Sequence, residues 1–538
     1  MRSHALSTWF LSSITLVATA MSAQAQSYIP RPLDDMIKDL GLEEYVKDIP
    51  SGDNLEGNVA ARCIIATEVL RRVLPSEVEM PGSGAYTSNK ESYWAQQQST
   101  LSPSCFVAAK SPKSVAKALA ISRVTQCPFA VRSGGHSDVP GASNTEEGIV
   151  IDLRAFNDIK VSEDKKVATV GPGATWAEVY RHLDEYGLTV IGGRASTVGV
   201  GGLALGGGMS YISGRGGFAC DNVLKFHVMM ADGHILEVDE KSHPLLYFAL
   251  RGGGNNFGIV LRFDFETYPL GEFWGGIRVY PVEAKEAING GLSSFNDNAW
   301  DDPDLAVITS FIHRSGNWYS TVIFDYAKPQ ANPPILTTNF ADLLKYTPSR
   351  DTSRITNMTQ FAVELGQGTP PGLRQQFTTV TYRNSAEVQN RMVDIFMEEV
   401  KNIEGRMSAK EAFAPIVAFQ PIPPSISSKF SKRGGNALGV SPDDGPLILV
   451  NLCFQWSNAA DDQLVISTID RVLEKTNEFA RSKGLLHDYI YMNYAAPYQK
   501  PVTSYGAENV KKLRKAQEEY DPSLVFERLQ PGGFKLDM

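Results

Sequence analysis

Hydrophobic and polar positions follow two different rhythms in the first half of the chain. Apolar residues at helical spacing alternate with short, β-rich runs bounded by turn residues. We therefore predict helices at 33–46, 60–74, 114–123, 176–186 and 245–251, and strands at 104–108, 128–131, 148–153, 166–170, 189–191, 224–230, 234–238 and 259–267. Residues 86–102 are rich in Ser, Gln and Asn and are predicted to form a loop. This mixture indicates an α+β unit.

The pattern changes between about residues 273 and 480, where long runs alternate strictly between apolar and polar residues. Alternation is typical of an antiparallel sheet with one covered face. The predicted strands are 306–313, 318–326 and 447–456, and the predicted helices are 386–404 and 461–482. A tail follows, with a helix at 507–520 that ends before Asp521-Pro522. We predict a second domain of different architecture here.

Length and charge narrow the class of protein. The 538 residues exceed one ordinary core and suggest two or three domain-sized units. Hydrophobic residues make up 43%, as in a globular protein that buries large cores. The net charge is −9, and no run of lysine and arginine could follow a phosphate backbone, so we expect no nucleic-acid partner.

The N-terminus has the pattern of an export signal. Arg2 precedes the apolar run 9–20, and Ala23-Gln24-Ala25 fits the small-x-small cleavage motif, so we predict cleavage after Ala25. The alternative, a membrane anchor, needs ~20 apolar residues, more than this run has. The sequon at Asn357 is compatible with a secreted glycoprotein.

The cysteines favour a disulfide over a metal site. None of the five forms a Cys-x-x-Cys pair, so we expect no metal. In an oxidising compartment we predict a Cys63–Cys105 disulfide, because both residues lie in the early, loop-rich part of the chain. The other three are expected to be small buried side chains.

Two glycine-bearing stretches are candidates for ligand binding. The first, 132–137, follows the apolar run 128–131, so bare backbone N–H groups, a charged arginine and a histidine lie together. Alone it is equally consistent with a turn that carries a surface histidine. The second, 192–208, lets the backbone approach a planar or anionic ligand.

The second stretch also matches a loose nicotinamide fingerprint, Gly199-x-Gly201-x-x-Ala204, with Asp221 at the offset of a ribose partner. Glycines 206–208, 214, 216 and 217 occupy the place of the required helix, which argues against that interpretation. P-loop, His-Glu-x-x-His and nucleophile-elbow motifs are absent from the sequence.

Taken in order, these stretches resemble the flavin domain of the vanillyl-alcohol-oxidase, or PCMH, type. The motifs that carry the resemblance are 132–137, 171–176, 197–202, 221–223, 231–233 and 250–260. The tail motifs 491–494, 505–509 and 520–526 resemble the berberine-bridge-enzyme-like branch, and with the export signal they point to secreted fungal FAD-linked oxidases. The resemblance covers about half of the chain, roughly 100–270 and 485–530.

The resemblance implies an α+β fold with a PCMH-type FAD-binding domain. A substrate domain with an antiparallel sheet flanked by helices would follow, and the C-terminal segment would return to the FAD domain. The expected divisions are a signal peptide at 1–25, a cap at 26–98, the FAD domain at 99–271, the substrate domain at 272–480 and the returning segment at 481–538.

The resemblance also implies the cofactor and how it is held. FAD would lie against the glycine loops, bonded covalently through its 8α-methyl to His136, which keeps it bound and raises its electron affinity. Many relatives add a cysteinyl bond, but Ala195 occupies that position, so we predict a single link. The expected cofactor-binding residues are Arg132, Ser133, Gly134, Gly135, His136, Ser137, Thr197, Val198, Gly199, Gly201, Gly202, Gly207, Asn222, Val223, Gly258, Ile259, Val260 and Asn493.

Three residues carry the implied catalysis. Val198 stands where the family admits dioxygen to the flavin, so peroxide release is expected. Tyr491 and Tyr494 match the motif that takes the substrate proton; the alternative for all three is core packing. An unperturbed tyrosine pKa near 10 requires environmental lowering or concerted transfer.

The expected function is an FAD-dependent oxidase that acts on an alcohol, phenol or activated C–H of a small metabolite, in fungal secondary metabolism. An extracellular carbohydrate oxidase is the alternative, and Trp318, Tyr319 and Phe454 could contact either substrate. A flavin-bearing protein that guides cyclisation without net turnover is a third hypothesis, which His136 and Val198 disfavour.

Overall fold

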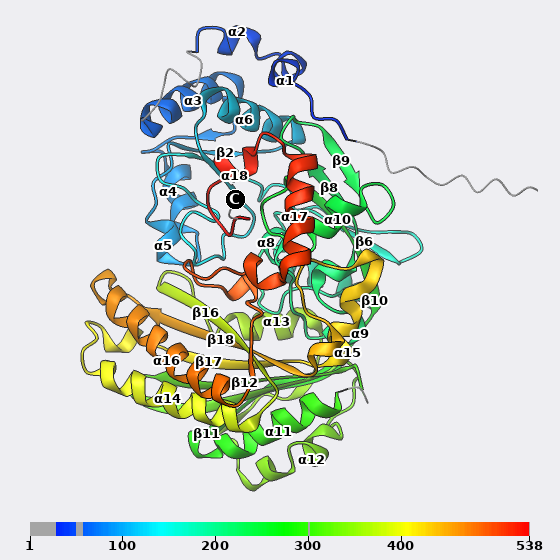
Figure 1. The fold of residues 1–538 in the computed structure, drawn as a ribbon, viewed down its shortest axis with the longest axis vertical. Helices are drawn as coiled ribbons and strands as arrows, with labels where there is room; N and C mark the ends of the chain where they lie inside the picture. Colours follow the sequence, from blue (N-terminus) through cyan, green and yellow to red (C-terminus); the bar gives the residue numbers. More distant parts are fainter. Residues whose placement is uncertain (1–27, 50–57, 300–301, 537–538) are drawn as a thin grey trace, which may run out of the picture.

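In the part of the chain that the structure describes, helices pack on three β-sheets (Figure 1). The computed structural model describes residues 28–49, 58–299 and 302–536. The predicted α+β class is confirmed. The expected export signal lies outside the described residues.

The first sheet is four-stranded, in the order β1-β2-β4-β3, and β4 runs parallel to β2 and β3. Helix α6 begins after Ser111, whose hydroxyl accepts a hydrogen bond from Ser114 N, and Pro112 pre-sets its first turn. The strands are β1 Val78–Glu79, β2 Cys105–Ala108, β3 Phe129–Arg132 and β4 Ile149–Asp152, and the helices are α1 Leu33–Leu40, α2 Glu43–Val46, α3 Val59–Val73, α4 Gly84–Glu91, α5 Gln96–Ser99 and α6 Pro112–Thr125.

The second sheet is antiparallel, in the order β5-β6-β10-β8-β9, and β7 pairs with β10. Its strands are β5 Ile159–Val161, β6 Val167–Val170, β7 Leu188–Val190, β8 Val223–Met229, β9 Ile235–Val238 and β10 Ile259–Pro269, and its helices are α7 Trp176–Asp184, α8 Val200–Leu205, α9 Ser213–Gly216 and α10 Pro244–Leu250. Helix α8 has six residues and ends at Gly206, far short of a Rossmann helix.

The third sheet has the order β14-β11-β13-β12-β17-β18-β16-β19, with β15 paired to β11. Helices α11, α14 and α16 pack on this sheet and share a hydrophobic core with it (Figure 1). The strands are β11 Phe273–Pro281, β12 Leu305–Arg314, β13 Asn317–Tyr326, β14 Arg350–Asp351, β15 Arg354–Thr356, β16 Arg374–Arg383, β17 Ile416–Ile422, β18 Leu447–Trp456 and β19 Leu486–His487. The helices are α11 Lys285–Asn298, α12 Ile335–Thr338, α13 Met358–Gly366, α14 Ala386–Glu404, α15 Pro424–Ser427 and α16 Asp462–Ser482.

Alternation predicted one covered face for this sheet, and the structure covers both faces of its central strand. Every residue of β18 is buried. Its even-numbered residues pack into the core shared with α14 and α16, while Cys453 and Asn451 face a cavity at the FAD domain. The polar half of the alternation therefore lines a site.

The C-terminal segment returns to the FAD domain, as predicted. Helix α17 (Ala507–Tyr520) packs on α10, and the Tyr505 hydroxyl donates to Gly252 O at 3.0 Å. After α18 (Val525–Arg528), Leu529 O accepts a hydrogen bond from Phe129 N at the start of β3.

Two local predictions were wrong. Cys63 bonds to Cys127 rather than to Cys105; the Cys105 thiol instead accepts a hydrogen bond from Thr67, one turn beyond Cys63 on α3. Residues 86–102 include most of α4 and all of α5, because Ser83 caps α4 and the intervening Trp94 is buried.

Candidate flavin and substrate site

A cavity of about 470 Å³ lies where the two FAD-domain sheets meet the third sheet. Its walls come from loops after β3, β7 and α10, from β12, β17 and β18, and from the tail. The predicted residues that line it are Ser133, Gly134, Gly135, His136, Ser137, Val198, Gly199, Gly201, Gly202, Gly258, Ile259, Val260, Tyr491, Asn493 and Tyr494. The fold thus brings together stretches that are far apart in the sequence.

The His136 imidazole is held parallel to Trp94. The ring centroids are 4.3 Å apart and the planes differ by 11°. His136 Nε2 is buried without a hydrogen-bond partner, and burial lowers the pKa of the imidazole to about 4. The ring is therefore neutral at pH 7 and keeps a free lone pair.

The two glycine loops touch through their backbones. A Cβ on Gly134 would lie 2.5 Å from Gly199 N, and a Cβ on Gly199 would lie 2.3 Å from Gly134 N. The Ser133 hydroxyl joins the loops further, because it donates to Pro172 O and accepts from Gly201 N at 3.2 Å. Only glycine permits this approach, which leaves a narrow backbone cradle.

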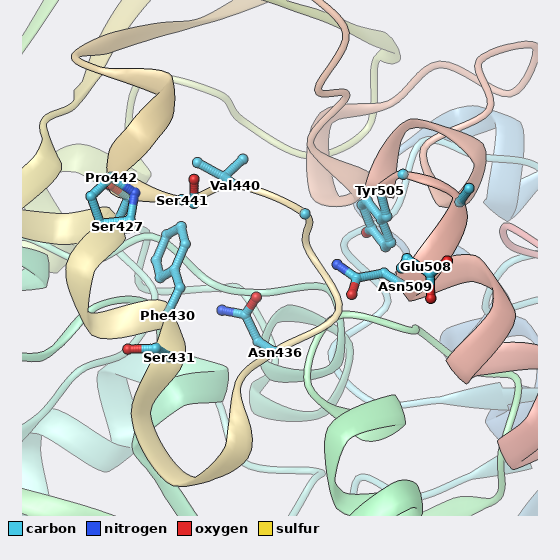
Figure 2. Close-up of a pocket in the computed structure, with 13 residues that line it drawn as sticks. Ser427, Phe430, Ser431, Asn436, Val440, Ser441, Pro442, Tyr505, Glu508 and Asn509 are labelled. Carbon is cyan, nitrogen blue, oxygen red and sulfur yellow. The ribbon is translucent and has the colours of Figure 1, made fainter.

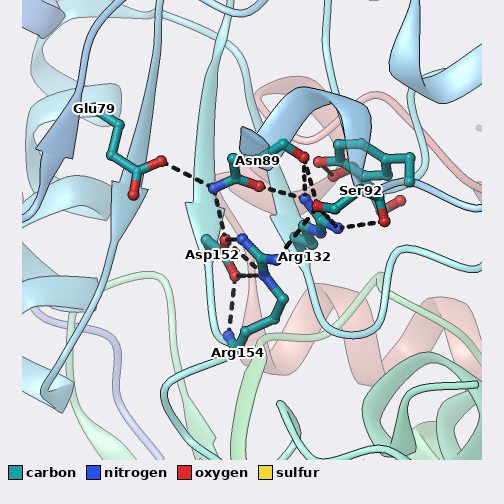
Figure 3. A network of polar contacts seen from close by, with 8 residues as sticks. Glu79, Asn89, Ser92, Arg132, Asp152 and Arg154 are labelled. Carbon is teal, nitrogen blue, oxygen red and sulfur yellow. Dashed lines mark hydrogen bonds and ion pairs between the residues drawn. The ribbon is translucent and has the colours of Figure 1, made fainter. Parts of the chain in front are cut away.

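Arg132 does not line the cavity, which corrects its expected role as a charge beside the ligand. Its guanidinium is buried in the network of Figure 3 and donates to the main-chain and side-chain oxygens of Asn89 and Ser92. The guanidinium also lies 3.8 Å from the Tyr93 ring centroid. Arg132 therefore fixes the segment that carries Trp94, and acts on His136 through that stacking partner.

Four other expected cofactor residues lie outside the cavity wall: Thr197, Gly207, Asn222 and Val223. Thr197 is exposed, whereas Val223 is buried in the core. Gly207 has φ +118°, and a Cβ there would lie 3.1 Å from the Tyr491 ring. Asn222 donates to Gly216 O and Phe218 O and accepts from Tyr268 and Lys432, which fixes a turn.

Asp221 is also structural. It is fully buried, accepts hydrogen bonds from Phe218 N and Asn436 Nδ2, and has a pKa raised to about 6 by burial. The residue therefore ties the segment around Asn436 to the FAD domain, and no ribose-binding role remains for it.

The Tyr491 hydroxyl oxygen already accepts hydrogen bonds from three neighbouring groups of the protein. Its oxygen accepts from Gly208 N at 3.0 Å, Met209 N at 3.1 Å and Asn493 Nδ2 at 3.1 Å. Burial raises the pKa of Tyr491 above its usual value. The geometry favours a role in shaping the backbone at 206–209 over a role as proton acceptor.

Tyr494 is the more accessible hydroxyl. It accepts a hydrogen bond from Arg194 at 2.6 Å and donates to Gln420 Oε1 at 3.3 Å, and Arg194 also donates to Gln420. Tyr494 is half-buried, and Phe377 packs edge-on against its ring. Arg194 supplies a positive charge beside the phenol oxygen, which stabilises negative charge that develops there.

The wall contributed by the third sheet is largely apolar and neutral. Its residues are Ile308, Ser310, Ile323, Phe377, Ile416, Ala418, Gln420, Asn451 and Cys453. Trp318 and Phe454 point to the opposite face and pack on Phe396, and Tyr319 does not line the cavity. The prediction that these three aromatic residues line the substrate site was therefore wrong. Alternation along the strands turns the side chains of Trp318 and Phe454 toward the helices.

Asp138 adds a titratable group beside His136. It is buried, its Oδ2 accepts from Phe377 N at 2.6 Å, and burial raises its pKa to about 7. The carboxyl is neutral below that value, so Arg194 is the charged side chain of the cavity at mildly acidic pH.

A second pocket of about 520 Å³ lies between residues 427–442 and the start of α17 (Figure 2). Phe430 and Pro442 stand on one side, and Tyr505 and Asn509 on the other. None of the predicted site residues lines it, so we place the chemistry in the 470 Å³ cavity.

The residues present fit a flavin nucleotide. The glycine loops leave a backbone cradle, and His136 Nε2 is a buried nitrogen without a partner. Within residues 28–49, 58–299 and 302–536, no group of His, Cys, Asp and Glu could hold a metal ion, and no helix is long and apolar enough to cross a membrane.

Comparison with known proteins agrees with this fit. Residues 103–239 match the FAD binding domain family. The FAD-dependent monooxygenase FUP4 of Fusarium proliferatum is 41% identical over 463 residues, covering 85% of this chain and 90% of the relative. The FAD-dependent monooxygenase tpcD of Cochliobolus heterostrophus is 41% identical over 450 residues, covering 83% of this chain and 87% of that relative.

Among solved structures, the BBE-like 1 protein of Physcomitrella patens superposes with a TM-score of 0.71 at 19% identity, covering 88% of this chain and 99% of that one. This chain belongs to the family of FAD-dependent oxidoreductases that includes FUP4 and tpcD, and it has the PCMH-type FAD-binding fold of the berberine-bridge-enzyme-like oxidases. The resemblance drawn from its motifs is confirmed.

Several site residues escaped the sequence analysis: Trp94, Asp138, Arg194, Phe377, Gln420 and Asn451. Arg194 lies inside the second glycine stretch, so its position was a usable signal. Gln420 and Asn451 sit in alternating strands, where nothing local distinguishes a wall residue from a solvated one.

Proposed function

We propose that the protein is an FAD-dependent oxidase that removes a hydride from an alcohol, phenol or activated C–H of a small metabolite, and that dioxygen is reduced to hydrogen peroxide. The carrying observation is the cavity in which the unpartnered His136, the glycine cradle and the Arg194–Tyr494–Gln420 group meet. Bound FAD supplies the hydride acceptor.

Single covalent attachment through His136 is part of this proposal. Formation of a nitrogen–carbon bond needs a neutral imidazole, and the pKa of about 4 leaves His136 unprotonated at pH 7. Trp94 holds the ring plane, which limits the directions in which the nitrogen can point. Ala195 lines the cavity without a thiol, so it cannot supply a second bond.

Tyr494 is the proposed proton acceptor. Arg194 donates to its oxygen, and Gln420 accepts from it, so the hydroxyl is oriented and negative charge on it is stabilised. Val198 lines the cavity beside Gly199, and we propose that dioxygen reaches the flavin past its side chain.

The walls favour a neutral, largely apolar substrate over an oligosaccharide. Sugars are held by many polar contacts, but isoleucine, alanine and phenylalanine dominate the third-sheet wall. Asn451 Oδ1 is buried there without a partner and can accept one hydrogen bond from a substrate hydroxyl. A phenolic or polyketide-like metabolite of fungal secondary metabolism fits this lining.

Monooxygenation is the second candidate, favoured by the similarity to FUP4 and tpcD, which are named FAD-dependent monooxygenases. That reaction places one atom of dioxygen in the product and consumes an external two-electron donor. The oxidase reaction needs no added donor and releases one peroxide for each substrate oxidised.

We also propose that the protein is secreted or resides in the lumen of the secretory pathway. The Cys63–Cys127 disulfide supports an oxidising compartment. Asn357 caps α13 through Oδ1, which accepts from Gln360 N, so glycosylation there would have to leave the cap intact.

The test is stoichiometry on two substrate panels, one of apolar phenols and alcohols and one of oligosaccharides. We expect peroxide equal to product on the first panel, without added NADPH. Turnover confined to sugars would overturn the substrate class, and ¹⁸O from labelled dioxygen in the product would establish monooxygenation instead. Turnover on neither panel would favour the third hypothesis, a flavin-bearing protein that guides cyclisation without net turnover.

A further inference from the structure

The chain end after α18 forms a wall of the flavin cavity. Residues 530–536, called the strap below, contribute Gln530, Gly533 and Phe534 to the lining. None of the flavin-domain or tail motifs recognised in the sequence includes these three residues, which follow the last tail motif at 520–526. Only the folded structure therefore shows that the strap lines the cavity.

The strap is fixed on both sides by the FAD domain. A Cβ on Gly532 would lie 1.7 Å from Gly141 O, so the strap lies directly on the loop that follows β3. On the other side Asn255 Nδ2 donates to Gly532 O at 2.9 Å, and Asn256 Nδ2 donates to Phe534 O at 2.9 Å.

Lys535 completes this attachment. Its ammonium donates to Phe526 O at 3.0 Å and to Asn255 Oδ1 at 3.3 Å. These contacts hold the strap between the first and second sheets, and none of them reaches the substrate sheet. His136 and Tyr494 lie beside the substrate sheet, because Phe377 of β16 packs on Tyr494 and on Trp94, which stacks on His136.

Gln530 carries the observation that points to a ligand. The residue is 2% exposed, it lines the cavity, and its Oε1 is buried without a hydrogen-bond partner. Ser143 Oγ, on the loop that Gly532 touches, is likewise buried without a partner and lines the cavity. Buried polar atoms are rarely left unpaired, so a bound group is expected to satisfy both.

We propose that the strap completes the adenosine end of the FAD site, and that Gln530 Oε1 accepts a hydrogen bond from the adenosine half while Phe534 lies against it. This inference rests on the proposed function. The isoalloxazine end is assigned to His136, so the nucleotide extends between the two FAD-domain sheets toward the strap. Adenosine offers the N–H and O–H donors that an amide oxygen needs.

The test uses the full chain with His136→Ala, so that flavin binding is reversible. Dissociation constants for FAD, FMN and ADP are measured in this parent, in Gln530→Leu and in the closer isostere Gln530→Met. Gln463→Leu, the same change on an exposed site of α16, is the matched control.

We expect both Gln530 variants to weaken FAD and ADP binding about 5- to 10-fold and to leave FMN, which lacks adenosine, unchanged. The ligand-free variants should unfold at the same temperature as the parent or higher, because an unpartnered buried amide is removed. Phe534→Ala should weaken the same two ligands.

Equal weakening of FAD and FMN, or no change in either, would overturn the strap proposal while leaving the proposed function intact. Absence of FAD and FMN binding in the parent itself would overturn the proposed function, and the strap proposal with it.

Discussion

The Trp94 indole lies flat against the His136 imidazole, 4.3 Å between centroids, although Trp94 lies outside every motif recognised in the sequence. Trp94 Nε1 donates to Thr369 O in the substrate domain, so the stacking ring is itself anchored. We expect Trp94→Ala to lower the fraction of covalently bound flavin, because the imidazole loses its orienting partner.

Trp94→Phe should retain most of the attachment, since an aromatic face remains. The measurement is the ratio of acid-precipitated to released flavin absorbance in purified protein. Equal covalent fractions in Trp94→Ala and the parent would contradict the orienting role.

Tyr494 and Tyr491 should respond differently to loss of their hydroxyls. Tyr494→Phe is expected to lower kcat by roughly 10²- to 10⁴-fold with the flavin content unchanged, as for loss of a general base. Tyr491→Phe leaves the buried donors of Gly208 and Met209 unpaired, so about 1–3 kcal/mol of stability should be lost.

Steady-state kinetics and thermal unfolding of both variants separate the two roles. A larger loss of kcat in Tyr491→Phe than in Tyr494→Phe would reverse the assignment.

The raised pKa of Asp138 should make the stability of the protein depend on pH. Its pKa is raised from 3.8 to about 7, so the folded state holds a proton that the unfolded state has released. The stabilisation is complete below pH 3.8 and is lost as the pH rises through 7, on the order of 4 kcal/mol in total. Asp138→Asn should therefore flatten the fall in unfolding temperature between pH 5 and 8. An unchanged pH profile in that variant would exclude Asp138 as its source.

The backbone contact between the glycine loops predicts an asymmetric response to alanine. Gly199→Ala should cost about 1–3 kcal/mol and weaken flavin binding, because its Cβ would lie 2.3 Å from Gly134 N. Gly290→Ala, in helix α11 and outside the cavity lining, is the matched control, since nothing lies within 4 Å of a Cβ there. It should be neutral or stabilising by up to about 1 kcal/mol. Unfolding curves and flavin content of the two variants give the comparison.

The sequence predicted those parts of the molecule whose signal is local. Glycine spacing, the histidine after Gly135 and the tyrosines of the tail each lie within one short motif, and the structure gathers them in one cavity. Strands and helices with clear periodicity, such as 386–404, match the observed elements.

The parts that sequence reasoning missed depend on distant contacts. Arg194 and Tyr494 are 300 residues apart, and Gln420 joins them from a strand of another domain. The disulfide partner of Cys63 was chosen by nearness in the chain, whereas packing of α3 against α6, which ends two residues before Cys127, brings Cys127 to Cys63. Arg132 looked like an anion ligand because charge beside glycine suggests one, but its guanidinium turns into the segment at Asn89 and Ser92.

The most direct test of single covalent attachment is acid precipitation of the purified protein and of His136→Ala, with flavin absorbance read in pellet and supernatant. The parent should carry all of its flavin in the pellet, and His136→Ala should release all of it. Flavin that stays in the His136→Ala pellet, or that leaves the parent pellet, would contradict a bond through His136 alone.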